Sequence, residues 1–433
     1  DLLGKLGSIE KSESVIKDTI DKIKNDEVEI SRITKSVLVI DEAQDMTEDE
    51  FNLITALIDK NETLKVIAVG DDDQNIYSFR KSDSKYMQYL ISKYQARFYE
   101  LYENFRSKSN LVTFANSFVN QIPHRMKHNP IVSHQPENGS LRITYYPSNN
   151  LIIPLIKDVV ESPLAGTTGV LTKTNEEAVF ISCLLQEQGI ATKLVQTNSS
   201  NFYLGDLNEI RYFTQVLNLT KDTHIIDNER WEVAKRKLKY EFGNTSSWEI
   251  CRSIILTFEQ IYSRKYLSDW KTYLFESNLE DFYSAQGETV IVSTIHKAKG
   301  KEFDNVFLLL NNGNSLSDEK KREIYVAITR AKQNISIHLN GHYFNNIVNG
   351  LTEIRTDNNQ YPIPQRLCYL LTHKDLNLDT FISSYCQAAI YNLKSGMPLQ
   401  LKANGCTDFH GNEILRFSRK FQNTLEELDK KGY

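Results

Sequence analysis

The stretch Val37-Leu-Val-Ile-Asp-Glu-Ala-Gln-Asp45 is the part of the sequence that predicts the fold most directly. Four apolar residues lead straight into the acids Asp41 and Glu42. A short apolar run bounded by polar residues is typical of a buried parallel strand, and open α/β sheets bind ligands just beyond the carboxyl ends of such strands. Paired acids there suit a hydrated Mg²⁺, with one acid on the metal and its neighbour taking a proton from water. For an isolated Asp-Glu pair, a solvated strand end is the simpler interpretation.

The composition is that of an ordinary soluble globular protein. The 433 residues are 40% apolar and 25% charged, and this length suits two or three domains. No stretch approaches the roughly 20 apolar residues of a membrane helix, so we expect a cytoplasmic protein without membrane contact. The net charge is −5, so any basic footprint for a nucleic acid has to be local.

The cysteines and histidines do not form a recognisable ligand pattern. An odd, scattered set of cysteines without C-x-x-C indicates a reducing compartment and disfavours a disulfide framework or a zinc site. The five cysteines are Cys183, Cys251, Cys368, Cys386 and Cys406. His124, His128 and His134 lie near one another, but no cysteine or acid joins them at ligand spacing, so we expect a polar surface loop.

The first part of the chain has a βαβ pattern. An amphipathic helix over 9–30 precedes the strand 37–40, and Thr47 with Glu50 has the spacing of a capping box that opens the next helix. A second apolar run, 64–69, ends in Gly-Asp-Asp-Asp-Gln74. Two strands with polar tips, separated by a helix, favour parallel pairing. Further on we expect a short strand at 97–101, a helix with Leu111, Phe114, Ala115 and Phe118 on one face, and a linker at 123–140.

A second α/β pattern follows, interrupted by a helical region. We expect a strand followed by a helix cap over 170–175, and a helix over 176–188 closed by Gly189. Further strands are expected at 191–195, 290–294, 306–310 and 335–339. Residues 216–285 have helical periodicity and contain all three tryptophans, which we expect to be mostly core. Residues 324–332 form a helix or strand with a basic tip, and the tail 345–433 has a helix near 377–394 and strand-like segments at 398–402 and 413–419.

The polar tips together offer the groups that phosphoryl transfer needs. Gln74 can touch a γ-phosphate or position the attacking water, while Arg106 and Arg330 follow apolar segments and supply fixed positive charge. Taken singly, each arginine is more often a surface ion-pair residue. Their occurrence with Asp41 and Glu42 in one chain favours an ATP site.

Two other stretches favour a nucleic-acid partner. Tyr77-Ser-Phe79-Arg80 alternates aromatic rings with a cation, and an extended backbone would present both rings on one face for stacking unpaired bases. His296-Lys-Ala-Lys-Gly-Lys301 is a basic cluster that could follow a phosphate backbone. Taken singly, the rings are more often core and the lysines a solvated face.

In this order the stretches resemble the motifs of UvrD/Rep-type superfamily 1 DNA helicases. The matching segments are VLVIDEAQD (37–45), VGDDDQNIYSFR (69–80), LYENFRS (101–107), VLTKTN (170–175), STIHKAKGKEFD (293–304) and YVAITRAK (325–332). The resemblance covers roughly residues 30–340, and the combination is highly specific. Two departures are mild: Lys81 stands where the family usually has glycine, and Lys301 stands where it has an apolar residue.

The resemblance implies a role for each matching residue. Asp41 would hold Mg²⁺. Glu42 would also lie close to the metal and would activate water, and Gln74 would contact the γ-phosphate of ATP. Arg106 and Arg330 would contact the γ-phosphate from opposite sides, Arg330 as a finger from a second domain. The implied nucleotide contacts are Phe105 on the adenine, Glu302 on the ribose, and Gly300. The implied DNA contacts are Tyr77, Phe79, Arg80, Thr294, His296 and Lys297, of which Thr294 and His296 would either meet DNA or couple it to ATP.

The implied fold is α/β, with two RecA-like (P-loop NTPase-type) parallel sheets, one partial and one complete, a small helical insert and an α+β tail. The expected domains are 1–122 for the rest of the first RecA-like domain, 123–215 with 286–344 for the second, 216–285 for the insert and 345–433 for the tail. In the family, ATP closes the cleft between the two RecA-like domains, and this drives 3′→5′ movement. The implied partners are single-stranded DNA and single-strand/duplex junctions.

One motif of the family is absent from these 433 residues. No G-x-x-x-x-G-K-[ST] phosphate loop occurs, and the insert is shorter than the accessory domain of full helicases. Either the chain is the C-terminal portion of a helicase whose phosphate loop precedes Asp1, in which case the chain alone is inactive, or it is a non-catalytic nucleic-acid-binding or regulatory module. The abrupt start favours the first. Repair, plasmid replication, recombination and phage defence all stay open as pathways.

Overall fold

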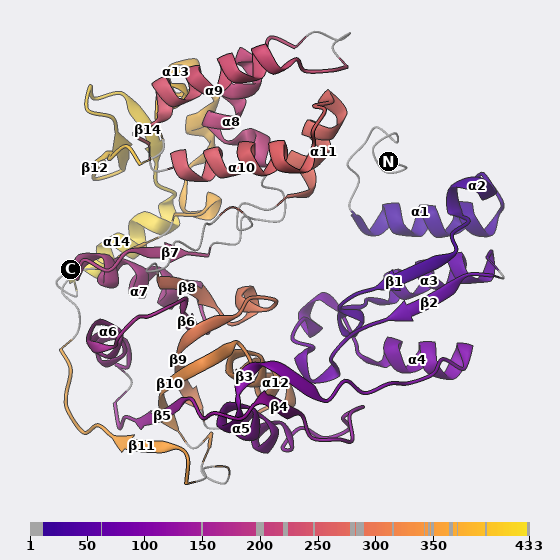
Figure 1. The fold of residues 1–433 in the computed structure, drawn as a ribbon. Coiled ribbons are helices and arrows are strands. Elements are labelled where there is room, and N and C mark those ends of the chain that lie inside the picture. Colours follow the sequence, from indigo (N-terminus) through magenta and orange to yellow (C-terminus); the bar gives the residue numbers. More distant parts are fainter. Residues whose placement is uncertain are drawn as a thin grey trace. The chain divides into compact units, whose positions relative to one another are not determined.

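The structure is a computed structural model, drawn as a ribbon in Figure 1. The chain divides into two compact units. It describes residues 12–430 except 62, 149, 196–202, 220–223, 246, 278–281, 283–289, 314–315, 342, 345–346, 348–349, 363–366, 370 and 395. Unit 1 comprises 1–155, 164–173 and 294–360, and unit 2 comprises 156–163, 174–293 and 361–433. The predicted helix start at Ile9 and the predicted end of the insert at 285 lie outside the described residues.

Unit 1 begins with the predicted βαβ arrangement. The first elements are α1 (Ser12–Lys24), α2 (Ile30–Ile33), β1 (Val37–Ile40), α3 (Glu48–Asp59), β2 (Lys65–Ala68) and α4 (Lys85–Tyr94). The capping box of α3 is present, because the Thr47 hydroxyl accepts from the Glu50 amide while the Glu50 carboxylate accepts from the Thr47 amide. Strands β1 and β2 pair in parallel, with Val37 opposite Lys65. The parallel pairing places the two polar tips at the same end of this small sheet.

The expectation that β1 is buried is wrong. Val37 and Val39 are 49% and 63% exposed, and Ile67 and Val69 in and just after β2 are 53% and 46% exposed. These side chains alternate along the strands, so they share one face of the sheet. The face is exposed because β1 and β2 form a sheet of only two strands, and no layer within the described residues covers it.

The larger sheet has seven strands in the order β11-β5-β10-β9-β6-β8-β7. Five belong to unit 1: β5 (Ser140–Tyr145), β6 (Thr168–Thr172), β9 (Phe303–Gly313), β10 (Ala331–Gly341) and β11 (Glu353–Thr356). Their pairings are parallel, and so is that of β7 (Thr192–Leu194) with β8 (Val290–Thr294) in unit 2. Helices α5 (Ser109–Val119) and α12 (Asp318–Ile328) pack on each other and on β10 (Figure 1). The predicted α/β class, with one partial and one large parallel sheet, is confirmed.

Two predictions for the middle of unit 1 are wrong. No strand forms at 97–101; the strand is β3 (Glu103–Lys108), which therefore carries Phe105 and Arg106 itself. The segment 123–140 is not a linker, because it contains β4 (Val132–Gln135), which pairs in parallel with β3. The polar residues in 123–140 are typical of a loop in the sequence. In the structure they bond to other parts of unit 1. The sequence also did not indicate β5, β11 or α6 (Ile152–Glu161).

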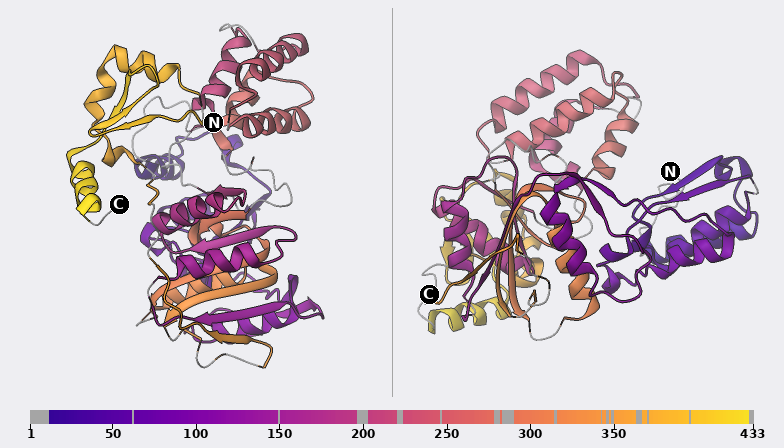
Figure 2. Two further views of the ribbon diagram at one scale, coloured as in Figure 1. Left: turned by 90° about the vertical axis from the view of Figure 1, so that its left-hand side faces the viewer. Right: turned by 60° about the horizontal axis from the view of Figure 1, so that its bottom comes forward.

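Unit 2 contains a helical bundle around the tryptophans. Its helices are α8 (Asn208–Val216), α9 (Asn228–Phe242), α10 (Trp248–Ile261) and α11 (Leu267–Glu276), which lie together in both views of Figure 2. Trp231 and Trp270 are 1% and 0% exposed, and their rings meet edge to face with centroids 5.2 Å apart. Trp248 packs against the same cluster from its rim. The expectation of mostly core tryptophans is confirmed.

A buried acid weakens this bundle. Glu209 on α8 is 0% exposed, and neither carboxylate oxygen has a hydrogen-bond partner in the part of the chain that the structure describes. Burial raises the pKa of the nearby Cys251 thiol, and the charge of Glu209 raises it further. We therefore expect Glu209→Met to raise the free energy of unfolding of the bundle by about 1–3 kcal/mol.

Tryptophan fluorescence during urea unfolding measures this effect selectively, since all three tryptophans of the chain lie in or against the bundle. Glu209→Gln is the matched control and should gain much less, because it keeps polar atoms in the same place. A Glu209→Met protein that unfolds at lower urea than the wild type would contradict the prediction.

The remaining elements of unit 2 are α7 and the tail. They are α7 (Asn175–Glu187), α13 (Ser384–Tyr391), α14 (Arg419–Lys430) and the antiparallel strands β12 (Gln400–Lys402), β13 (Gly405–Thr407) and β14 (Glu413–Arg416). The predicted helix near 377–394 corresponds to a 3₁₀ turn followed by α13, whereas β13 and α14 were not predicted. Lys394 joins the tail to the bundle through a 2.6 Å ion pair with Glu241.

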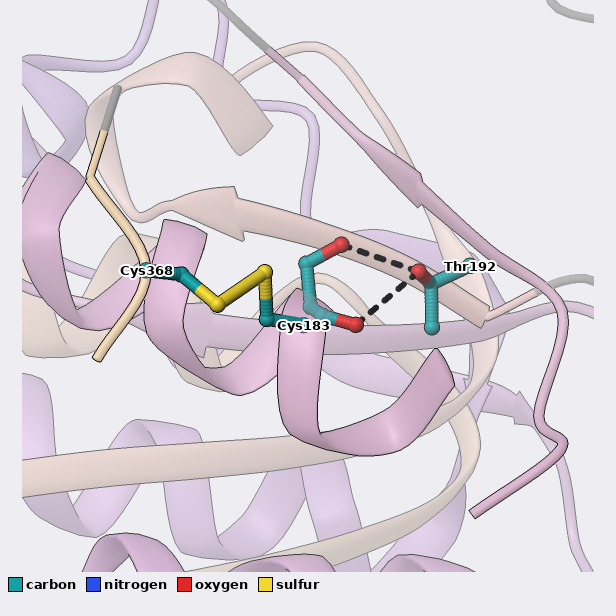
Figure 3. The surroundings of a disulfide bond; sticks show 4 residues. Cys183, Thr192 and Cys368 are labelled. Atoms are coloured by element: carbon teal, nitrogen blue, oxygen red, sulfur yellow. Dashed lines mark hydrogen bonds between the residues drawn. A yellow bond between two sulfur atoms is a disulfide. The ribbon is translucent and has the colours of Figure 1, made fainter. Parts of the chain in front are cut away.

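The expectation against disulfides is wrong for one pair of cysteines. Cys183 on α7 is bonded to Cys368, and Figure 3 shows the bridge beside the Thr192 hydroxyl, which hydrogen-bonds to Ser182. The two cysteines are 185 residues apart in the sequence, so no local spacing could have revealed the pairing. The bond fixes the start of the tail to α7.

Candidate functional site

The tips of β1 and β2 are joined by one buried amide side chain. Gln44, which is 0% exposed, accepts a 2.9 Å hydrogen bond from the Asp71 amide and donates to the Glu42 carboxylate. Gly70 permits this approach, because a Cβ there would lie 2.5 Å from the Gln44 oxygen. Asp41 accepts a 2.9 Å bond from the Glu42 amide, and both acids stay exposed. The predicted pair of acids therefore stands open to solvent on a fixed backbone.

Gln74 and Arg330, predicted from separate motifs, are in direct contact. An Arg330 Nη donates to the Gln74 amide oxygen at 2.8 Å, and the Gln74 nitrogen donates to the Asp71 carboxylate at 2.8 Å. Arg330 is 3% exposed and also donates to the carbonyl oxygens of Val326 and Lys301. Burial lowers the pKa of Arg330 to about 10, so its guanidinium is charged at neutral pH.

Arg106 lies next to Arg330 but is held by an acid. Its Nε donates to the Glu302 carboxylate at 2.6 Å, and one Nη donates to the Thr329 carbonyl at 3.3 Å. Glu302 also pairs with Lys332 at 2.8 Å, and these contacts with Lys332 and Arg106 lower its pKa. Glu302 is thus engaged by two cations, and Gly300 near it has a left-handed φ of 78°. The charge of Arg106 contributes to the lowered pKa of Arg330.

Phe105 presents a largely open aromatic ring. It is 63% exposed on β3, and within the described residues its ring contacts that of His134, with centroids 4.6 Å apart. An exposed ring of this kind provides a stacking surface for a planar base.

The predicted DNA-contacting aromatics form one cluster, but by a different backbone from the one expected. Ser78–Arg80 is a 3₁₀ turn, so the segment is not extended. The rings of Tyr77 and Phe79 nevertheless meet at 5.9 Å, and His296 lies 6.1 Å and 5.8 Å from them. The Tyr77 hydroxyl donates to the His296 carbonyl at 3.2 Å. Phe79 is 69% exposed, so the cluster has one open ring.

The other predicted DNA contacts differ in exposure. Arg80 is exposed beside the Tyr77 ring, with its guanidinium carbon 5.9 Å from the centroid, and Lys297 is half-buried. Thr294 is only 5% exposed, so its side chain does not present a surface. Lys81 has a left-handed φ of 63°, the conformation that favours glycine.

Lys299 is not the solvated lysine that the basic cluster suggested. Its side chain is 6% exposed, and its ammonium pairs with Asp45 and lies 3.6 Å from the Glu42 carboxylate. It also sits 5.0 Å from the centroid of the Tyr77 ring. Burial raises the pKa of Asp45, although Lys299 opposes that effect. Lys299 therefore connects the aromatic cluster with the acids that follow β1.

Models of known families match most of these residues. The UvrD-like helicase C-terminal domain matches residues 99–275 and 249–341, which together cover more than half of the chain. The chain belongs to the UvrD-like helicases. The UvrD/REP helicase N-terminal domain matches residues 15–95, which include Asp41, Glu42 and Gln74.

Several curated proteins are similar to this UvrD-like chain. Gabija protein GajB of Bacillus cereus is 20% identical over 72% of this chain and 65% of its own length. The mitochondrial ATP-dependent DNA helicase HMI1 of Saccharomyces cerevisiae is 24% identical over 56% of this chain and 36% of its own length. DNA helicase II of Escherichia coli is 34% identical over 19% of this chain and 11% of its own length. The chain thus spans less than two thirds of these relatives. Among its described residues, no helix is long and apolar enough to cross a membrane.

Two side chains of this UvrD-like site have contacts that the sequence does not reveal. The motif at 37–45 indicates no separate role for Gln44, and the basic pattern at 296–301 predicts that Lys299 is solvated. The available clue for Gln44 is its place between Glu42 and Asp45, just beyond the end of a predicted strand. No local clue existed for Lys299, because its partner Asp45 is 254 residues away.

Proposed function

We propose that this chain is the motor part of an ATP-dependent DNA helicase that moves 3′→5′ along single-stranded DNA. The observation that supports this most is the continuous set of hydrogen bonds from Glu42 through Gln44, Asp71 and Gln74 to Arg330. It connects an exposed acid suited to activating water with a buried arginine suited to a phosphoryl group. Such a set of groups fits phosphoryl transfer better than it fits a passive binding surface.

In this proposal the residues of the site divide the work of ATP binding and hydrolysis. Asp41 and Glu42 offer exposed carboxylate oxygens, the donor type that Mg²⁺ prefers, and Mg²⁺ would neutralise charge on the phosphates of ATP. Glu42 accepts the proton of the attacking water. Gln74 and Arg330 act on the γ-phosphate, with Arg106 released from Glu302 as the second cation. Phe105 stacks on the base of the nucleotide, and Glu302 and Gly300 bind near the ribose.

We infer that the exposed apolar face of β1 and β2 is covered in the full-length protein by a segment that carries a phosphate loop. Val37, Val39, Ile67 and Val69 would be covered by a segment of the same protein that carries the loop and extends this sheet, because uncovered apolar faces of this kind mark interaction sites. The expected division at 1–122, 123–215 with 286–344, 216–285 and 345–433 is part of the same proposal. The ATP site then lies between the first two of these regions.

Unwinding assays test the proposed direction. The full-length natural protein is mixed with ATP, Mg²⁺ and duplexes that carry a single-stranded tail at either the 3′ or the 5′ end. We expect strand separation with the 3′ tail and little with the 5′ tail. Equal unwinding of both substrates, or a preference for the 5′ tail, would contradict the proposed polarity.

The aromatic cluster predicts a specific DNA-binding defect. Phe79→Ala removes its open ring, and because stacking contributes about 1–3 kcal/mol per base, we expect the Kd for single-stranded DNA to rise roughly 5- to 150-fold. Fluorescence anisotropy with a labelled oligonucleotide measures it. Phe275→Ala is the matched control, since Phe275 is 80% exposed on α11 and should leave the Kd unchanged. Equal affinities for the Phe79→Ala variant and the wild type would remove Phe79 from the DNA site.

A further inference from the structure

Three consecutive residues before β4 bond to three consecutive acids after β2. Arg125 makes a bidentate contact with the Asp73 carboxylate at 2.8 and 2.9 Å. The Met126 amide donates to Asp72 at 2.7 Å. Lys127 pairs with Asp71 at 2.6 Å and with Asp73 at 3.0 Å. We call Arg125–Lys127 the basic strap.

The acids under the strap are deeply enclosed. Asp72 and Asp73 are 5% and 1% exposed, and the Lys127 side chain is 15% exposed. Burial alone would lower the pKa of Lys127, but Asp71 and Asp73 raise it above its usual value, so the ammonium is charged. The three carboxylates are close enough to suit a cation, but Arg125, the Met126 amide and Lys127 already bond to them. The cluster is therefore an internal ion-pair network.

Of the acids in this network, Asp71 is the one that bonds to the side chain of Gln74, a residue of the candidate site. One of its oxygens accepts from Lys127, and the other accepts from the Gln74 side-chain nitrogen at 2.8 Å. This second bond fixes which end of the Gln74 amide faces Arg330, whose Nη donates to the Gln74 oxygen at 2.8 Å. An amide released from Asp71 could rotate and present its NH₂ group to the guanidinium, which has no acceptor.

We propose that Lys127 is a positioning residue for ATP hydrolysis: by holding Asp71, it orients the Gln74 amide toward Arg330 and the γ-phosphate. The inference rests on the proposed function for its effect on turnover, although the geometry it describes does not. Lys127 touches neither nucleotide nor DNA in this account. Its loss should therefore lower kcat without a matching change in substrate binding.

The chain offers a matched pair of variants. Lys127→Met removes the ammonium and keeps the length of the side chain. Arg125→Gln removes a cation from the same strap, but the acid that Arg125 contacts, Asp73, makes no side-chain bond to Gln74. In the full-length protein with single-stranded DNA, we expect Lys127→Met to lower kcat roughly 10- to 100-fold, as small misplacements of catalytic groups do. The KM for ATP and the Kd for DNA should stay within about threefold, and Lys127→Arg should restore most of the activity. Arg125→Gln should lower the thermal midpoint of unfolding at least as much as Lys127→Met does, but it should lower kcat less.

A double-mutant cycle separates positioning from a general structural role. If Lys127 acts through Gln74, the Lys127→Met/Gln74→Ala protein should have the kcat of Gln74→Ala alone, within about twofold. Multiplying effects in the double variant would overturn the inference. So would an equal loss of kcat in Arg125→Gln and Lys127→Met, because that outcome reflects damage to the whole network.

A crystal structure of the Lys127→Met variant gives a test that needs no turnover. We expect the Gln74 amide to leave Asp71 and its contact with Arg330 to lengthen or disappear. If both hydrogen bonds persist, the inference is overturned whatever the protein hydrolyses. If the wild-type protein does not hydrolyse ATP but the amide does move in the variant, the positioning geometry holds and the proposed function fails.

Discussion

Glu42→Gln is expected to abolish ATP hydrolysis by the full-length protein while leaving ATP and DNA binding intact. Glu42 is an exposed carboxylate at the tip of β1, held by Gln44 and approached by Lys299, and a general base of this kind contributes about 10²–10⁴-fold to the rate. The substitution replaces one oxygen by an NH₂ group, so it removes the basic site with little change in shape. Single-stranded DNA-stimulated phosphate release measures kcat, and equilibrium binding measures the two affinities.

The control for this variant is Glu48→Gln. Glu48 is exposed in the first turn of α3, six positions further along the chain, and the same chemical change there should leave kcat unaltered. If Glu42→Gln retains the kcat of the wild type, the proposed general base is wrong. If Glu42→Gln and Glu48→Gln lower kcat equally, the effect comes from lost negative charge in this region.

Arg330→Gln is expected to have the second large effect. Arginine fingers contribute on the order of 10³–10⁵ to phosphoryl transfer, and Arg330 is charged, buried and aimed at Gln74. We expect kcat to fall about 10³-fold or more. Because its guanidinium also donates to the carbonyl oxygens of Val326 and Lys301, we expect an additional loss of roughly 1–3 kcal/mol in stability.

Arg330→Lys separates these two effects. Lysine keeps the charge but lacks the planar fork that bonds Gln74 and the backbone together, so it should restore part of the stability and little of the turnover. Arg416→Ala, a change in an exposed arginine on β14, controls for loss of a cation elsewhere. If the Arg330→Gln protein is folded and hydrolyses ATP within threefold of the wild-type rate, Arg330 does not act as an arginine finger.

The features that local rules govern could be predicted from the sequence. The capping box of Thr47 and Glu50 and the strands on either side of α3 follow from spacing within a few residues, and both are present. The acids at the tip of β1 follow from the same rules. The motifs in their order were enough to indicate the family, because their combination is highly specific although single residues within them have simpler interpretations.

The contacts that assemble the site could not be predicted, since they join distant parts of the chain. Lys299 looks like a solvated lysine until the fold places it against Asp45, and Lys127 looks like part of a linker until the fold places it against Asp71. The turn at Ser78–Arg80 ends at Lys81 in a left-handed conformation, which a lysine in the sequence does not predict. The exposure of Val39 depends on which layers cover a strand, and an apolar run carries no information about that.

The central claim is that the bonded set from Glu42 to Arg330 serves DNA-dependent ATP hydrolysis. The most direct measurement is the steady-state rate of phosphate release by the full-length natural protein, with ATP and Mg²⁺, in the absence and presence of single-stranded DNA. We expect a low basal rate that rises at least tenfold when single-stranded DNA is added, and no rise in the Glu42→Gln variant. A folded protein that binds single-stranded DNA yet shows the same rate with and without it would contradict the claim and favour a non-catalytic DNA-binding module.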